Sequence, residues 1–286
     1  MNVGMIGFGA MGREMAGHTA ATGDHRVLAY DIDPGAVAAA ADQGIVSAAT
    51  ATEVAQDSDV VLIMVATDDQ ALSVAQELAA AEAPGTLLAV TATLHPDTMK
   101  AIGALVAPGG LSVIDAPVVF GLYGAKEGIL VSLCGGTAED VERAKPVLSG
   151  YSRAVYHLGP LGSGMVAKAV NNMLHWSACV ANFEALSLAK RCGMDVQKLR
   201  EVLFDCPADN GTLRRWDSTK FTWPEKDMDI ALDLAQAGGL VLPLFGQVDQ
   251  LVKLLTPEQV AGLLHGESTT YLGNEVTPKP LSNELD

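Results

Sequence analysis

A lysine and an asparagine one helical turn apart are the residues best suited to acid–base chemistry. Lys168 and Asn172 belong to the segment G-S-G-M-V-A-K-A-V-N-N, which begins at Gly162. Residues four apart on a helix share a face, and His175 extends that face by another turn. A lysine amine can take up or release a proton, and an asparagine amide can hold an oxygen beside it. The segment could therefore exchange a proton with a substrate oxygen.

Lys168 could instead be an ordinary solvated lysine, which is the usual situation for this residue type. Leu174, Trp176 and the alanines around them indicate that the helix is mostly buried. A lysine–asparagine pair on such a helix, preceded by a glycine-rich turn, is typical of a cleft. For His175 two interpretations stay open: a polar contact to a substrate, or a hydrogen-bonded histidine of the core.

A glycine-rich loop near the N-terminus is suited to binding phosphates. An expected strand at residues 2–6 leads into G-x-G-x-x-G, whose residues are Gly7, Phe8, Gly9, Ala10, Met11 and Gly12. Gly7 permits a tight turn, Gly9 lets the backbone approach a pyrophosphate, and Gly12 allows close packing of helix on strand. The N-terminus of the following helix offers free N–H groups and a positive dipole end. The pattern predicts a dinucleotide site.

Asp31 follows the second expected strand, 19 residues after Gly12. A carboxylate at this place can accept hydrogen bonds from the ribose hydroxyls of adenosine. Asp33 comes next, and two carboxylates would repel the 2′-phosphate of NADP, for which no Arg, Lys or Ser stands in place. We therefore predict NAD as the cofactor. The alternative is that Asp31 only caps the next turn.

Strands and helices alternate through the first half of the chain. Apolar runs predict strands at 2–6, 26–30, 59–64, 86–90 and 111–114, and helices are expected at 11–21, 35–42, 70–80 and 97–106. Two further strands, near 129–133 and 154–157, flank a helix that Thr137 could cap. This alternation favours an α/β fold with a Rossmann-type, doubly wound parallel sheet.

The pattern changes after residue 160. One long helix is expected over 164–192, followed by helices at 196–204, 226–237, 244–254 and 258–264 and an irregular tail after Gly266. We therefore expect a dinucleotide-binding domain at residues 1–160 and an all-helical C-terminal domain at residues 161–286, joined by the long helix.

Composition excludes several classes of partner. The 286 residues are 49% hydrophobic and 18% charged, and the net charge is −16. Such a charge repels phosphate backbones and anionic lipids, so nucleic acid and membrane surfaces are poor partners. No apolar run is long enough to span a bilayer, and no secretory leader is recognisable. We expect a soluble, cytoplasmic protein that acts on a small molecule.

Cysteine and histidine give no sign of a metal site. Cys134, Cys179, Cys192 and Cys206 are scattered without a C-x-x-C pair, and the six histidines are isolated. Four buried thiols in a reducing compartment, and no bound metal, are the expectation.

Four motifs in order make the sequence resemble the β-hydroxyacid dehydrogenase family, which includes 3-hydroxyisobutyrate dehydrogenase, tartronate semialdehyde reductase and 6-phosphogluconate dehydrogenase. The motifs are G-F-G-A-M-G-R-E-M-A, D-A-P-V from Asp115, G-S-G-M-V-A-K-A-V-N-N, and K-D-M-D-I-A-L-D-L-A from Lys226. The resemblance implies a Rossmann domain, an all-α domain and a homodimer or homotetramer. It implies that Lys168 is the catalytic lysine and that Asn172 binds substrate. It also implies cofactor contacts from Thr93, Lys226 and the loop Val65, Ala66 and Thr67.

The chemistry that the resemblance implies fits these residues. Oxidation of an alcohol by hydride transfer needs a partner for the hydroxyl proton. Partial desolvation beside a cationic nicotinamide favours the neutral amine of Lys168, which could accept that proton. In the reverse direction, the protonated amine would polarise the carbonyl and return the proton.

The substrate loop departs from the family pattern D-A-P-V-S-G-G. Val119 replaces the serine and Phe120 the first glycine, whereas Gly121 is kept. The hydroxyl that would donate a hydrogen bond to a substrate carboxylate is thus lost. An aromatic residue occupies the position where the backbone should approach the ligand closely. We predict an atypical, more apolar pocket lined by Val119, Phe120, Gly121 and His175, because an apolar pocket selects against an unpaired carboxylate.

Three alternatives stay open. An ordinary small 3-hydroxy acid could still be bound, with Arg214 or Arg215 as its partner. Imine reductases have a similar two-domain build, but they often carry another residue in place of the lysine and usually prefer NADP. A non-catalytic NAD-binding protein would be expected to have lost Lys168. The prediction is an NAD-dependent dehydrogenase acting on CH–OH groups.

Overall fold

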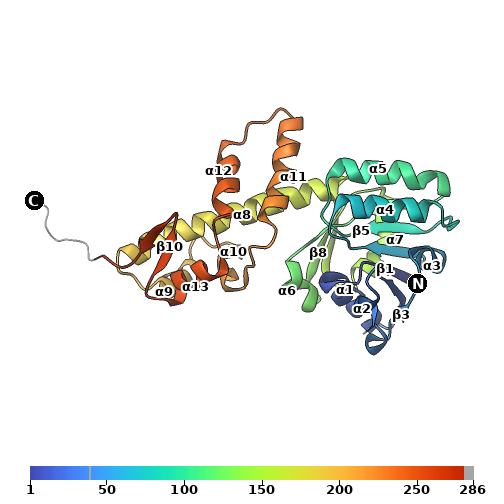
Figure 1. Cartoon of the computed structure of the whole chain (residues 1–286), viewed down its shortest axis with the longest axis horizontal. Coiled ribbons are helices and arrows are strands. Elements are labelled where there is room, and N and C mark those ends of the chain that lie inside the picture. Colours follow the sequence, from blue (N-terminus) through green and yellow to red (C-terminus); the bar gives the residue numbers. More distant parts are fainter. Residues whose placement is uncertain (39, 280–286) are drawn as a thin grey trace, which may run out of the picture. The chain divides into compact units, whose positions relative to one another are not determined.

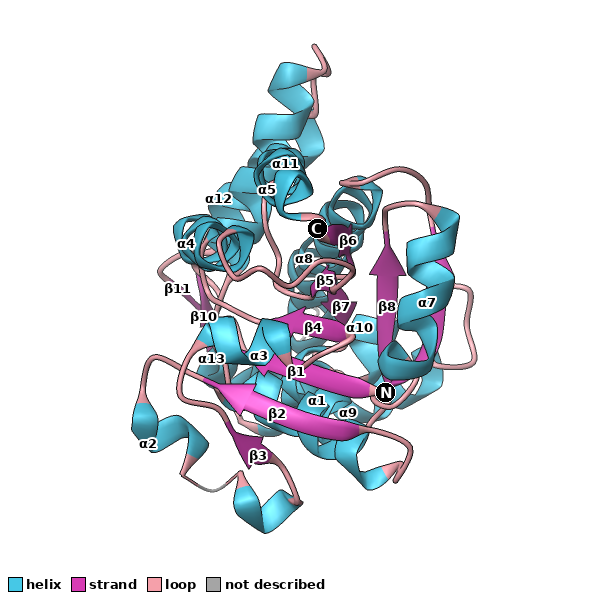
Figure 2. Cartoon of the chain, turned by 90° about the vertical axis from the view of Figure 1, so that its right-hand side faces the viewer, coloured by secondary structure: helices cyan, strands magenta, loops and turns pink. Residues whose placement is uncertain are grey.

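The computed structural model describes residues 1–38 and 40–279, which form two compact units divided between Lys168 and Ala169. The first unit is built on a six-stranded parallel sheet (Figures 1 and 2). Its strands are β1 (Asn2–Ile6), β2 (Arg26–Tyr30), β3 (Val46–Ser47), β4 (Val60–Ile63), β5 (Leu87–Val90) and β6 (Ser112–Asp115). The spatial order β3-β2-β1-β4-β5-β6 is that of a Rossmann sheet, as the sequence predicts.

Helices cover both faces of this sheet because successive strand residues point to opposite sides. On one face Val3, Met5 and Leu62 pack with residues of α1 (Ala10–Ala21) and α7 (Ala138–Leu148). On the other face Ile6 and Val61 pack with residues of α3 (Ala51–Gln56), α4 (Asp68–Ala79) and α5 (Pro96–Val106). Strands buried on both faces read as continuous apolar runs, which is why they are visible in the sequence.

A smaller sheet follows the main one within the first unit. It consists of β7 (Val118–Val119), β8 (Leu130–Cys134) and β9 (Ser152–His157), with β7 antiparallel and β9 parallel to β8. The helix α6 (Gly121–Lys126) lies between β7 and β8, and Thr137 caps α7, as expected, by accepting from Asp140 N at 3.1 Å. The two-residue strand β7 is too short to leave a periodic signal, and the sequence analysis did not find it.

The second unit is helical and includes most of the long helix α8 (Ser163–Arg191). The shorter helices are α9 (Val196–Leu203), α10 (Gly211–Arg214), α11 (Pro224–Ala237), α12 (Pro243–Val252) and α13 (Pro257–His265). Its core gathers residues from α8 and from the helices around it, including Phe183, Trp216, Met228, Val252 and Leu263. No helix of the described residues is long and apolar enough to cross a membrane.

The prediction of an irregular tail after Gly266 is wrong for residues 269–276. The strands β10 (Thr269–Tyr271) and β11 (Asn274–Val276) form an antiparallel hairpin. Its two turn residues, Leu272 and Gly273, have positive φ angles of 50° and 76°. A leucine seldom adopts this conformation, so the usual Asn-Gly or Asp-Gly signal of such a turn is missing from the sequence. Residues 280–286 of the expected tail lie outside the described residues.

Two smaller expectations also need correction. The helix expected over 35–42 is a short α2 (Pro34–Val37) followed by a separate 3₁₀ turn at Ala41–Gln43. Of the four thiols expected to be buried, Cys134 and Cys179 are buried, whereas Cys192 and Cys206 are partly exposed. Burial raises the pKa of both Cys134 and Cys179 to about 12, so these two thiols are unreactive at neutral pH.

Candidate active site

The glycine-rich loop between β1 and α1 has the geometry of a phosphate cradle. Gly7 has a φ of +92°, which favours glycine, and a Cβ atom on Gly12 would overlap the carbonyl of Gly7. Gly9 is exposed, and no atom lies within 4 Å of the place where its Cβ would be. Gly9 is also the N-cap of α1 and gives the helix no side-chain cap. The first N–H groups of α1 therefore suit a pyrophosphate.

Asp31 follows β2 and is hydrogen-bonded to the glycine-rich loop. Its Oδ2 accepts from Phe8 N at 2.7 Å, and its Oδ1 accepts from Asp33 N at 2.9 Å. The carboxylate therefore does cap the next turn, which was the alternative interpretation. Each oxygen still has a lone pair for a ribose hydroxyl, so capping and ribose binding are compatible.

The loops after β4 and β5 are connected to each other. Thr67 caps α4 by accepting from Gln70 N at 3.2 Å, and Ala66 N donates to Gln70 Oε1 at 2.8 Å. Asp68 Oδ2 accepts from His95 N at 2.9 Å, which ties the Val65–Thr67 loop to the loop containing Thr93. These loops lie at the carboxyl edge of the sheet, beside the switch point between β1 and β4 where α/β sheets bind ligands.

Lys168, Asn172 and His175 lie on α8 at the predicted spacing of four and three residues. Lys168 is partly buried, and the Asn172 side chain is buried, with Oδ1 accepting from Asn171 Nδ2 at 3.0 Å. An asparagine buried on a helix is costly unless its amide is satisfied. A substrate oxygen is a suitable further partner for the Asn172 amide.

His175 has partners within the second unit. Its Nδ1 lies 2.9 Å from Thr212 Oγ1, and its ring centroid lies 4.6 Å from that of Trp176. Trp176 is buried in the core and donates from Nε1 to Asp227 Oδ2 at 3.0 Å. Asp227 lies in the first turn of α11, directly after Lys226, so this bond fixes the segment that presents Lys226. One ring nitrogen of His175 is therefore in hydrogen-bond contact with Thr212, which agrees with the interpretation of His175 as a hydrogen-bonded histidine of the core.

The substrate loop has a strained residue where the family pattern has glycine. Phe120 has a φ of +88°, a left-handed conformation that costs a bulky residue about 1–3 kcal/mol. The Arg153 guanidinium lies 4.6 Å from the centroid of the Phe120 ring, in cation–π contact. A Cβ on Gly124 would lie 2.5 Å from Phe120 Cβ, so Gly124 makes room for the ring. Val119 is buried in β7 and pairs with Val131, while Gly121 is exposed.

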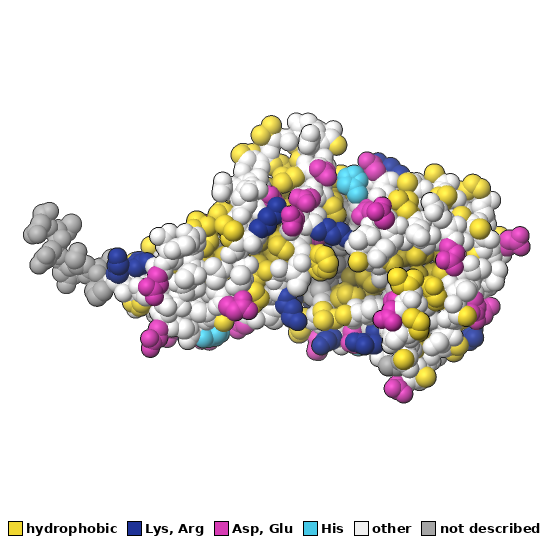
Figure 3. Space-filling view, in the orientation of Figure 1, with side chains coloured by type: hydrophobic (Ala, Val, Ile, Leu, Met, Phe, Trp, Pro, Cys, Tyr) yellow, Lys and Arg dark blue, Asp and Glu magenta, His cyan; other side chains and the backbone are white. Residues whose placement is uncertain are grey.

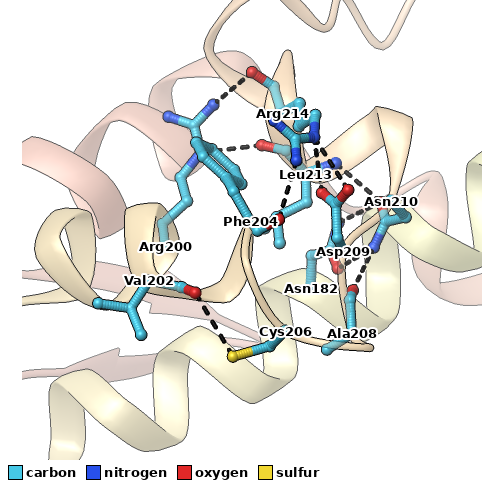
Figure 4. A network of polar contacts seen from close by, with 10 residues as sticks. All are labelled: Asn182, Arg200, Val202, Phe204, Cys206, Ala208, Asp209, Asn210, Leu213 and Arg214. Carbon is cyan, nitrogen blue, oxygen red and sulfur yellow. Dashed lines mark hydrogen bonds and ion pairs between the residues drawn. The ribbon is translucent and has the colours of Figure 1, made fainter.

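Arg214 belongs to a structural network in the second unit (Figure 4). It forms an ion pair with Asp209 at 2.9 Å, donates to Phe204 O at 2.9 Å and stacks on the Phe204 ring. The buried Arg200 donates to the carbonyls of Leu213 and Arg214 in the same network. These contacts hold α10 in place, which makes Arg214 a poor partner for a substrate carboxylate.

Asp115 makes buried contacts to the start of α8 that the sequence analysis missed. Its carboxylate is fully buried and accepts from Gly162 N at 2.7 Å and from Met165 N at 2.8 Å. Burial raises the pKa of Asp115, and these two hydrogen bonds oppose the rise. The only signal in the sequence is the position of an aspartate at the end of an apolar strand, within the quoted D-A-P-V motif.

Fold and site together define a two-domain oxidoreductase that binds NAD or NADP. Among the described residues no group of three His, Cys, Asp or Glu could hold a metal ion. Comparisons with known proteins agree that the chain is an oxidoreductase that binds NAD or NADP. Residues 2–159 match the NAD-binding domain of 6-phosphogluconate dehydrogenase, and residues 162–267 match the NAD-binding family of NADP-dependent 3-hydroxyisobutyrate dehydrogenase.

Individual relatives cover most of the chain. A 3-hydroxyisobutyrate dehydrogenase of Pseudomonas aeruginosa is 32% identical over 85% of this chain and 88% of its own. An NAD-dependent L-serine dehydrogenase of the same organism is 29% identical, over 91% and 93%. The structure of a Mycobacterium tuberculosis 3-hydroxyisobutyrate dehydrogenase with L-serine is similar, with a TM-score of 0.82 and 26% identity, over 92% and 99%. The chain belongs to the 3-hydroxyisobutyrate dehydrogenase family of β-hydroxyacid dehydrogenases and is a dehydrogenase acting on CH–OH groups.

Proposed function

We propose that the chain is an NAD-dependent dehydrogenase of the β-hydroxyacid type whose substrate pocket is more apolar than the family pattern. The proposed reaction type rests on Lys168 and Asn172, which lie one turn apart on α8. The pocket proposal rests on Val119 and Phe120. Both occupy positions where the family pattern offers polar or backbone donors.

Lys168 is the proton-transfer residue in this proposal. Its neutral amine accepts the hydroxyl proton of the substrate while the hydride leaves the carbinol carbon, and the product is a carbonyl compound. When bound, the dinucleotide supplies the hydride acceptor at its nicotinamide. Asn172 holds the reacting oxygen, so that the substrate keeps one orientation while its proton and its hydride are transferred. In the reverse direction, protonated Lys168 polarises the carbonyl.

The residues of the first unit fit the dinucleotide. Gly7–Gly12 would hold the pyrophosphate, Asp31 the adenosine ribose, and the Val65–Thr67 loop and Thr93 the nicotinamide half. The family resemblance implies a further cofactor contact from Lys226. Imine reductase chemistry is disfavoured because Lys168 and Asp31 are both present, and a non-catalytic protein would have no use for Lys168.

The choice of NAD over NADP depends on Asp31. We expect the wild-type protein to bind NAD at least about tenfold more tightly than NADP, a difference of about 1.4 kcal/mol. Asp31→Ser should reduce or reverse this preference while the serine hydroxyl keeps one loop amide satisfied. Calorimetric titration with both dinucleotides measures the ratio, with Asp42→Ser as the matched surface control. Equal or tighter NADP binding by the wild type would contradict the assignment.

An ordinary 3-hydroxy acid is the second candidate substrate, and the relatives favour it. They are described as acting on 3-hydroxyisobutyrate and L-serine. In that case Arg214 or Arg215 would be the partner of the carboxylate, and Arg214 already forms an ion pair with Asp209.

We further propose a homo-oligomer, on the basis of an exposed apolar stripe in the second unit. Val170, Leu174 and Leu188 share one face of α8 and are exposed by 50%, 60% and 66%. Apolar side chains also gather at the tip of the α11–α12 hairpin (Figure 3), where Val241 is 87% exposed. Large apolar side chains with this degree of exposure are typical of subunit contacts.

The oligomer proposal has a direct test. Leu188→Glu and Val241→Glu should shift the wild-type dimer or tetramer toward monomer in size-exclusion chromatography with light scattering, because a buried unpaired carboxylate opposes association. Val202→Glu, at a similarly exposed site on α9, should leave the mass unchanged. A wild-type protein that stays monomeric at high concentration would rule the proposal out.

The function itself is tested by NADH formation. Purified protein is mixed with NAD⁺ and, in turn, with 3-hydroxyisobutyrate, L-serine and larger apolar alcohols, and NADH absorbance is followed. We expect turnover with at least one of these classes. Tight NAD binding without oxidation of any alcohol would favour the non-catalytic alternative.

A further inference from the structure

Asp115 and the first turn of α8 form a tight buried contact within the first unit. Both carboxylate oxygens accept backbone N–H groups, from Gly162 and Met165, and the residue is 0% exposed. The first N–H groups of a helix have no partner within the helix, and a carboxylate is a suitable cap for them. Asp115 is thus an N-terminal cap of α8 supplied from a strand about fifty residues earlier in the chain.

The surrounding backbone leaves this carboxylate little freedom. Asp115 and Gly135 exchange two backbone hydrogen bonds, at 3.0 and 2.8 Å. A Cβ on Gly135 would lie 2.5 Å from Asp115 Oδ1, and one on Gly164 would lie 2.7 Å from Asp115 Oδ2. Two backbone segments, at Gly135 and at residues 162–165, therefore close around one side chain and leave the first turn of α8 little room to shift relative to β6.

Two segments with proposed functions lie close along the chain to the two sides of this contact. Lys168 lies three residues after Met165, less than one helical turn away. On the other side, Val119 and Phe120 follow Asp115 by four and five residues in the substrate loop. A shift of the first turn of α8 moves the Lys168 backbone directly relative to the loop.

We propose that Asp115 is the positioning residue for Lys168, fixing the start of α8 against the substrate loop so that the amine meets the substrate hydroxyl. This inference rests on the proposed role of Lys168 as the proton-transfer residue. Asp115 itself touches neither substrate nor cofactor in this account. Its effect is geometric, and small displacements of a catalytic group lower turnover steeply.

Asp115→Asn is the sharpest variant because it keeps the shape and one acceptor oxygen. Its amide nitrogen would face a backbone N–H donor and cannot accept from it. We expect kcat to fall about 10- to 100-fold, with the dissociation constant for NAD changed by less than about twofold. Amide hydrogen exchange should become faster at Gly162–Lys168 and stay unchanged in β1, β4 and β5.

Thr137→Ala is the matched control. Thr137 caps α7 in the same unit, so its loss weakens a helix that carries no proposed site residue. We expect kcat of this variant within about twofold of wild type at a similar loss of thermal stability. If Asp115→Asn lowers kcat no more than Thr137→Ala does, or leaves exchange at Gly162–Lys168 unchanged, the positioning role is refuted.

The test separates this inference from the dehydrogenase proposal. If the wild-type protein oxidises no alcohol, the dehydrogenase proposal is refuted. The predicted fall in kcat of Asp115→Asn is then refuted as well. Hydrogen exchange then still decides whether Asp115 anchors α8. An active wild type with a fully active Asp115→Asn refutes only the positioning role.

Discussion

Lys168→Ala is expected to lower kcat by at least about a thousandfold, while the affinity for NAD changes little. The amine is the proposed acceptor of the hydroxyl proton, and general acid–base groups contribute about 10²–10⁴-fold to turnover. Because the residue also orients the substrate oxygen, the loss should fall near the upper end of that range. Steady-state NADH formation gives kcat, and calorimetric titration gives the affinity for NAD.

Two further lysine variants sharpen this prediction. Lys168→Arg keeps a positive charge but cannot deliver a neutral base, so it should be nearly as inactive as Lys168→Ala. Lys100→Ala removes an exposed lysine that pairs with Asp97 on α5 and should be fully active. A Lys168→Ala protein with wild-type turnover would remove this residue from the mechanism.

The double substitution Val119→Ser and Phe120→Gly should increase kcat/KM for a small 3-hydroxy acid by about tenfold to a hundredfold. It returns a hydroxyl donor and an open backbone to the loop, and one hydrogen bond to a charged group contributes about 1.5–3 kcal/mol. Glycine also suits the φ of +88° at residue 120, so the backbone strain disappears. Turnover of bulky apolar alcohols should fall at the same time.

The control for this experiment is Val131→Ser. Val131 is the cross-strand partner of Val119, so the variant makes the same chemical change one strand away from the loop. It should leave the ratio of acid to neutral substrate unchanged. An unchanged ratio in the double variant as well would mean that Val119 and Phe120 do not select the substrate.

The parts of the fold that sequence predicts are those with strong local periodicity. The buried strands β1 and β2 have the predicted bounds, and α8 spans Ser163–Arg191 against an expected 164–192. The glycine-rich loop was predictable because local steric constraints favour glycine at each of these positions. Lys168, Asn172 and His175 share a helix, so their spacing alone placed them on one face.

The parts that sequence does not predict depend on contacts between distant segments or on unusual backbone angles. Asp115 is hydrogen-bonded to residues 47 and 50 positions away, which no local pattern encodes. The cation–π contact of Arg153 with Phe120 joins two elements across the small sheet. The β10–β11 turn and Phe120 use left-handed conformations at leucine and phenylalanine, where propensity argues against them.

The most direct test of the altered pocket is NADH formation from pairs of alcohols that differ only in a carboxylate. Each pair is measured with NAD⁺ and wild-type protein, and Lys168→Ala protein reports the background. The proposal predicts a higher kcat/KM for the neutral or bulkier apolar member of each pair, with no turnover by the variant. A consistent preference for the acids would contradict it and would assign the protein to ordinary small 3-hydroxy acids.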